Sequence, residues 1–111
     1  MKDKAAKDAA MITTQFRTRN GMAYELKCES AKLALAVSPR ESSSDADDWR
    51  VEASTRLTPG TEPVVVSAYG PTRTDALREV GRSWVESAPI SGLPTVDWEA
   101  VAQALIAVRA L

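Results

Sequence analysis

The chain has 111 residues, of which 44% are apolar and 26% charged, a composition that fits one soluble globular domain. Its net charge of -1 excludes a general attraction of the whole chain to nucleic acid or to anionic membranes. One cysteine, Cys28, and no histidine exclude an intramolecular disulfide, a cysteine-based zinc cage and the commonest general base. No apolar run reaches the ~20 residues of a membrane span, and the N-terminus lacks the apolar core of a signal peptide. We therefore expect a cytoplasmic protein without a cofactor or a membrane partner.

The first twenty residues are rich in alanine and charge, with five basic residues against two acidic ones. Asp3 and Lys7 are spaced to support a helical turn, but an isolated helix of this length is marginal in water. We expect residues 1–20 to be a mobile arm, either flexible or forming a short helix. Residues 21–111 are then expected to form a single α+β domain.

Residues 22–37 favour extended structure, but their pattern changes partway. Apolar residues occupy even positions at Tyr24, Leu26 and Cys28, and odd positions from Ala31 to Val37. A β-bulge explains the change, and so do two strands joined by a tight turn. A helix over residues 22–30 is a third alternative.

Residues 38–48 form a loop by composition, since serine, proline and acidic residues dominate them. Within this loop Asp45, Asp47 and Asp48 lack the glycine turn and the distant glutamate of a calcium loop, and we interpret them as solvated charges. Residues 49–58 then alternate strictly between apolar and polar side chains, which predicts a strand with one buried face.

A turn at residues 59–63 separates this strand from the next, which is predicted from Val64 to about Tyr69. A helix is expected after the break at Gly70 and Pro71, with Thr72 as its N-cap. Residues 87–94 are interpreted as a linker, and a second helix is expected from about Asp97. The predicted fold is a small antiparallel sheet of about three strands, packed by two C-terminal helices.

The segment from Val64 to Ser87 resembles the last strand and helix of double-stranded-RNA-binding domains, because a strand and a glycine turn lead into a hydroxyl-plus-basic helix start. Arg73 stands at one of the three positions that this family directs at phosphate, and Thr74 and Leu77 stand at the others. The sequence "TRTDAL" is also similar to the helix start of HicB-like antitoxin domains. Both resemblances imply a sheet-and-helix fold.

Two groups of surface residues are candidates for binding. Arginines on the middle strand and the first helix, together with the helix cap, are candidates for contact with nucleic acid or another anion; these are Arg50, Arg56, Thr72, Arg73 and Arg78. The wide apolar stripe of the last helix is a candidate for contact with a partner; it comprises Trp98, Val101, Leu105 and Val108. No catalytic or metal-binding set is predicted.

These patterns favour a small non-catalytic interaction module, which binds another protein or a second copy of itself. One alternative is a nucleic-acid-binding module with a fold like that of double-stranded-RNA-binding domains. A second alternative is an enzyme subunit, since carboxylates, lysines and tyrosines remain as acids and bases. Cys28 is interpreted as a small core residue rather than a nucleophile.

Overall fold

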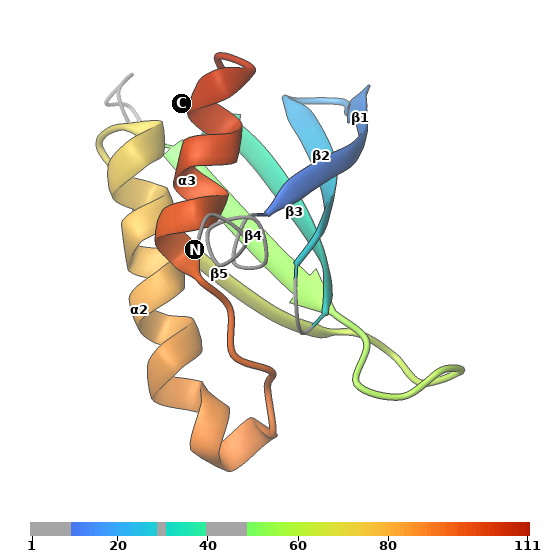
Figure 1. The fold of residues 1–111 in the computed structure, drawn as a ribbon. Helices are drawn as coiled ribbons and strands as arrows, with labels where there is room; N and C mark the ends of the chain where they lie inside the picture. Colours follow the sequence, from blue (N-terminus) through green and yellow to red (C-terminus); the bar gives the residue numbers. More distant parts are fainter. Residues whose placement is uncertain (1–9, 29–30, 40–48) are drawn as a thin grey trace, which may run out of the picture.

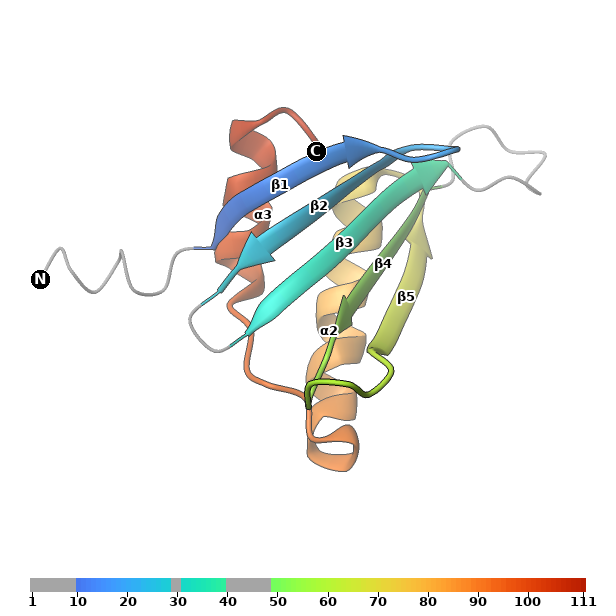
Figure 2. The same cartoon turned by 90° about the vertical axis from the view of Figure 1, so that its right-hand side faces the viewer.

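The structure is a computed structural model that describes residues 10–28, 31–39 and 49–111. Five strands form one antiparallel sheet in which each strand pairs with its neighbours in the chain (Figure 2). Two helices follow the sheet. The strands are β1 Met11–Arg17, β2 Met22–Lys27, β3 Lys32–Pro39, β4 Trp49–Thr55 and β5 Val64–Gly70, and the helices are α2 Arg73–Ser91 and α3 Trp98–Ala107.

The predicted number of about three strands is wrong, because the sheet has five. β1 lies within the segment that was expected to be an arm, so residues 11–17 form a strand of the sheet and not a short helix. Its sequence is polar because β1 is an edge strand and only Ile12, opposite Leu26, packs against the core. The expectations for residues 1–9 and for the acidic loop at residues 40–48 lie outside the described residues.

Between residues 22 and 37 the apolar positions switch from even to odd residue numbers because two strands form a hairpin there. Leu26 of β2 lies opposite Leu33 of β3, and Tyr24 lies opposite Leu35. All four side chains are buried on the same face of the sheet. Reversing the chain direction moves the buried positions from even to odd numbers, so neither a bulge nor a helix is needed here.

The core lies between this inner face and the helices. β4 contributes Val51 and Ala53, which are fully buried as the alternation predicts. The strand ends at Thr55, three residues earlier than predicted, and Leu57 beyond it is exposed. Thr55 is buried at the edge of the core. Its hydroxyl donates a hydrogen bond to the carbonyl of Lys32 at 2.8 Å, so this buried polar group has a partner.

Helix α2 begins as predicted. The hydroxyl of Thr72 accepts a hydrogen bond from the backbone N–H of Asp75 at 3.1 Å. The helix does not end at residue 87, however, and the predicted linker over residues 87–94 is wrong for its first half. Pro89 lies inside the last turns, and the helix ends at Gly92, whose φ of 70° is the left-handed conformation that glycine adopts readily.

Helix α3 also begins where the sequence predicts. The carboxylate of Asp97 accepts hydrogen bonds from the backbone N–H groups of Glu99 and Ala100, each at 3.1 Å. At the first turn of this helix, Trp98 packs against Gly81 and Trp84 of α2. This contact ties the start of α3 to the middle of α2.

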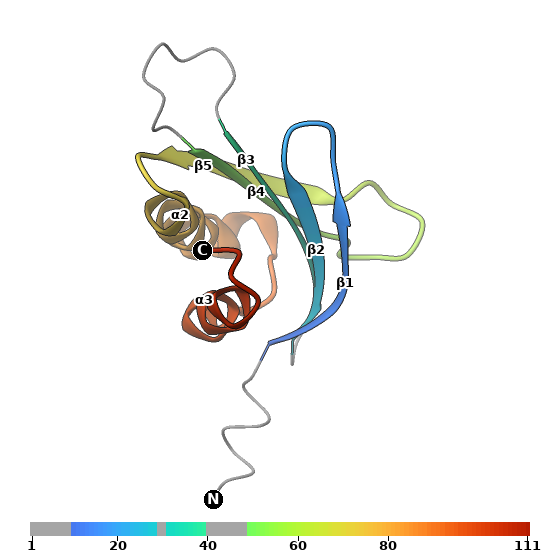
Figure 3. The same ribbon diagram turned by 90° about the horizontal axis from the view of Figure 1, so that it is seen from above.

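Both helices lie on the same side of the curved sheet (Figures 1 and 3). α2 packs against β4 and β5, whereas α3 contacts α2 and reaches β1. The opposite face of the sheet, which we call the outer face, is not covered by any helix of the described chain (Figure 3). Among the described residues, no helix has the length and hydropathy needed to span a membrane.

Candidate functional site

A groove of about 680 Å³ runs between α2 and α3 on the side of the helices away from the sheet. We call it the helix groove. Its floor is apolar because both helices turn small or apolar residues toward it; these are Leu77, Gly81, Val85, Trp98 and Ala102. Val85 is 62% exposed. Ile106, one turn beyond Ala102 on α3, is 51% exposed and extends the apolar surface along that helix.

Charged and polar side chains form the two walls of the helix groove. α2 contributes Arg78, Arg82 and Glu86, and α3 contributes Glu99 and Gln103. Arg82 forms ion pairs with Glu79 and Glu86 along α2, and these exposed pairs hold the guanidinium on the helix surface. Hydrogen bonding to Glu79 raises the pKa of Arg82, so this guanidinium stays charged at all ordinary pH values.

Trp98 is the residue on which the groove depends. A Cβ atom placed on Gly81 would come within 3.0 Å of the Cγ atom of Trp98, so glycine allows the indole to approach the backbone of α2. The rings of Trp84 and Trp98 meet edge to face with centroids 5.4 Å apart. Trp84 donates its Nε1–H to the carbonyl of Pro94 at 2.9 Å. In contrast, the buried Nε1–H of Trp98 has no partner among the described residues.

Of the four residues predicted to contact a partner, two are buried in the core and two are partly exposed. Val101 and Leu105 are fully buried in the core, so they are not on the surface and the prediction is corrected for them. Their side of α3 packs against the rest of the domain because α3 has to cover the open end of the core. Trp98 is partly exposed in the helix groove, and Val108 is 44% exposed at the C-cap.

The residues predicted to contact an anion are separated in the structure. Arg50 pairs with Glu52 at 2.8 Å on the outer face, and Arg78 pairs with Asp75 at 3.6 Å on α2. The guanidinium of Arg73 lies 4.9 Å from the ring centroid of Trp49. Thr72 uses its hydroxyl to cap α2. These side chains therefore do not form a joint basic surface.

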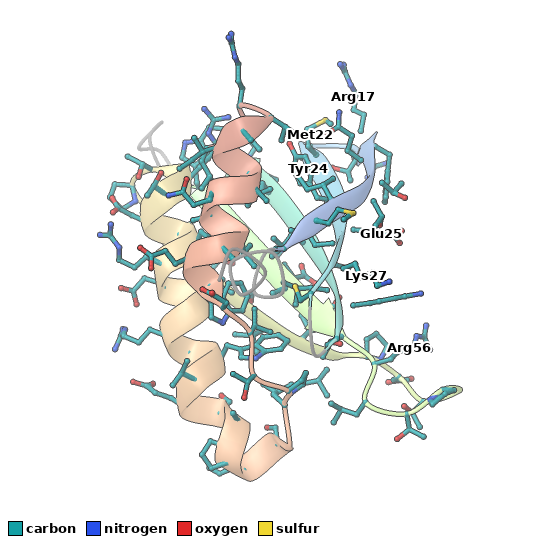
Figure 4. The ribbon with its side chains drawn as sticks, in the orientation of Figure 1. Arg17, Met22, Tyr24, Glu25, Lys27 and Arg56 are labelled. Atoms are coloured by element: carbon teal, nitrogen blue, oxygen red, sulfur yellow. The ribbon has the colours of Figure 1, made fainter. Side chains whose placement is uncertain are left out.

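Arg56 belongs to a different group, near the end of the outer face where β4 ends. Lys27 lies directly opposite Lys32 in the β2–β3 pairing, and both line a broad hollow of about 990 Å³ together with Arg56. Figure 4 shows Glu25, Lys27 and Arg56 on the side of the sheet away from the helices. Sequence reasoning missed the two lysines, because only the hairpin register places them side by side. We call Lys27, Lys32 and Arg56 the basic row.

Possible reactive groups include metal-ligating side chains and the one cysteine, Cys28. The described residues contain no group of three or more histidine, cysteine, aspartate or glutamate side chains that could hold a metal ion. Burial raises the pKa of the Cys28 thiol, and the nearby negative charge of Asp97 raises it further. At neutral pH the thiol therefore keeps its proton and is a poor nucleophile.

Comparisons with protein-family models, with curated proteins and with solved structures give no match for this chain. Two surfaces of the described chain are candidates for binding, the helix groove and the basic row.

Proposed function

We propose that the protein is a small non-catalytic binding module that takes a segment of another protein into the helix groove. The observation that carries this proposal is the combination of an apolar floor and charged walls between two helices. Such a groove suits an amphipathic helix, whose apolar side chains enter the groove while its polar side chains meet the walls. Exposed Val85 and Ile106 on either side would become covered on binding.

Trp98 is the expected anchor of this interaction. Tryptophan is enriched among the residues that contribute most to protein interfaces, because it buries a large area with few rotatable bonds. Here its ring already lies between Gly81 and Trp84, so little side-chain entropy remains to be lost on binding. The mixed charges of Arg78, Arg82, Glu86 and Glu99 would select the partner and its orientation.

Site-specific photocrosslinking tests this proposal. A photoreactive amino acid is placed at Gln103 in the groove wall, and in a control variant at Ser54 on the outer face. The expected result is a discrete crosslinked protein from Gln103 that Ser54 does not give. That protein is then purified, and its binding to the isotope-labelled domain is mapped by NMR chemical shifts.

Ala102→Glu provides the quantitative arm of the test. The added carboxylate enters the apolar floor, and we expect the isolated partner to bind at least about tenfold more weakly by calorimetry. The control Ser54→Glu is expected to bind as the natural chain does. If the partner binds the Ala102→Glu variant with unchanged affinity, or its chemical shifts map away from the groove, the helix groove is not the binding site.

Anion binding at the basic row is a second candidate function, and the Lys27–Lys32 pair is the observation that favours it. Like charges directly opposite each other destabilise a sheet, so an anionic ligand would relieve a cost that the fold carries. Titration of labelled single-stranded and double-stranded RNA at ~50 mM salt, where phosphate contacts are strongest, tests it. Binding that Lys32→Gln does not weaken, or no binding at all, removes this candidate.

A further inference from the structure

The two edges of the sheet differ in how well they are protected from pairing with another strand. β1 carries an irregularity between Ile12 and Thr14 and ends in Arg17, and both features discourage edge-to-edge pairing. β5 pairs with β4 in unbroken register over seven residues and contains neither a charge nor a proline. Three successive valines give it a high preference for extended structure. Within the described part of the chain, β5 is therefore the less protected edge.

The sequence of β5 is complementary to itself in the antiparallel direction. If a second copy of the strand is placed so that Ser67 lies opposite Ser67, all seven residues find a partner within Val64–Gly70. Val66 then lies opposite Ala68, and Val64 opposite Gly70. On the outer face Val65 lies opposite Tyr69 twice, once on each side of the two-fold axis.

The outer-face pairs are suited to this arrangement. Val65 and Tyr69 are 49% and 47% exposed in the single chain, so both lose exposed apolar surface on pairing. Aromatic and β-branched residues directly opposite each other are favourable cross-strand pairs. On the adjacent strand, Arg50 and Glu52 lie opposite Tyr69 and Ser67 and neutralise each other, so no isolated charge is covered.

We propose that two copies of the chain associate through β5, in antiparallel register about a two-fold axis at Ser67, to form one continuous sheet. Pro63 and Pro71 stand at the two ends of the strand and limit the pairing to it. The contact is isologous and closes on itself, so a dimer rather than a fibre is the product. This inference does not depend on the helix groove, which lies on the α3 side of α2.

Helix α2 lies beside the proposed contact. It packs beneath β4 and β5, so the two copies of α2 become neighbours when the strands pair. By helical spacing, Glu79 and Ser83 lie on the side of α2 that faces away from α3 and hence toward the partner. Glu79 is paired with Arg82 on its own helix, so no isolated charge meets its copy at this contact.

Sedimentation equilibrium of the full chain tests the proposal. We expect the mass to rise with concentration from 12.0 kDa toward twice that value. Ser67→Lys places two cations opposite each other at the axis and should raise the dissociation constant at least about tenfold. The matched control Thr14→Lys adds the same charge to an exposed position on the other edge strand and should leave the dimer unchanged.

Disulfide formation gives a second readout that does not require Ser67→Lys to fold. In a Cys28→Ser background, Ser67→Cys brings two thiols together at the axis, and a covalent dimer is expected under mild oxidation. Ser38→Cys, which lies on the outer face of β3, should crosslink at least about tenfold more slowly. A chain that stays monomeric up to ~0.5 mM, or Ser67→Cys crosslinking no faster than Ser38→Cys, would overturn the proposal.

Discussion

The two tryptophans at the helix contact occupy similar surroundings but differ in one hydrogen bond. Trp84 is almost completely buried and donates to the carbonyl of Pro94, which holds the segment before α3 in place. Trp98 has its Nε1–H buried without a partner among the described residues. The stabilisation by Trp98 therefore comes from the packing of its ring on Gly81 and Trp84 rather than from a hydrogen bond to the described residues.

Substitution by phenylalanine separates the two roles. Trp84→Phe leaves the carbonyl of Pro94 without its donor and removes core volume, and we expect it to lower the free energy of unfolding by about 2 kcal/mol. Trp98→Phe removes the unsatisfied N–H and should change it by less than ~1 kcal/mol. Urea denaturation measures both values. Equal losses for the two variants would contradict this account.

The thiol of Cys28, which follows β2, titrates under the influence of Asp97 at the start of α3. Its pKa lies above the ordinary value of 9.0, first through burial and then through the charge of Asp97. The folded thiol therefore holds its proton to a higher pH than the unfolded one. This group contributes stability below its ordinary pKa, and the contribution is lost as the pH rises through the raised folded value.

Asp97→Asn isolates the electrostatic part of this shift, because asparagine also caps helices. We expect the midpoint of the pH dependence of Cys28 alkylation by iodoacetamide to move to lower pH in this variant. The matched control Glu99→Gln, in the same first turn, should leave the midpoint where it is. A midpoint that moves equally in both variants would show that Asp97 has no special effect on the thiol.

At the scale of elements, local sequence signals predicted the helix starts and the central strands. Thr72 caps α2 as predicted, and α3 begins close to Asp97 as expected, since a helix start depends only on a short segment of chain. β1 could not be predicted, because an edge strand shows little alternation and is defined by its pairing with β2. The extension of α2 through Pro89 was missed because proline and glycine together suggest a linker, whereas only Gly92 ends the helix.

The candidate sites also depend partly on local sequence and partly on tertiary packing. The apolar stripe of α3 was visible in the sequence, but which of its residues face the core depends on the position of the sheet. Val101 and Leu105 turned out to be core residues, and only Trp98 belongs to the groove. The contribution of Gly81 to that groove is a contact between two helices, for which a single helix sequence holds no signal.

Gly81→Ala tests the contact between the helices. Alanine favours a helix by about 1 kcal/mol over glycine, so an isolated helix would gain stability. Here the new Cβ atom would meet the indole of Trp98, and we expect a net loss of about 1–2 kcal/mol in the free energy of unfolding. In a Trp98→Ala background the same substitution should become stabilising. An unchanged sign in the two backgrounds, measured by urea denaturation, would contradict the proposed packing.

On the scale of the whole molecule, the domain is a one-sided structure. The helices cover the inner face of the sheet and leave the outer face without a covering helix of the described chain (Figure 3). Small residues of that face, such as Ala34, Ala36 and Ser38, lie directly opposite the charged residues Glu25, Glu52 and Arg50. The three surfaces with a proposed role are therefore well separated: the groove on the helices, the basic row at one end of the outer face, and β5 at the edge.

The strand order has a kinetic consequence. Each strand pairs with the strand that precedes it in the chain, so every pairing step closes only a short loop. Chains dominated by such local contacts fold fast, and we expect a main refolding phase on the order of milliseconds by stopped-flow tryptophan fluorescence. The docking of α3 beside β1 joins the two ends of the described chain and is the long-range step. Ile12→Ala should therefore accelerate unfolding while leaving the refolding rate nearly unchanged.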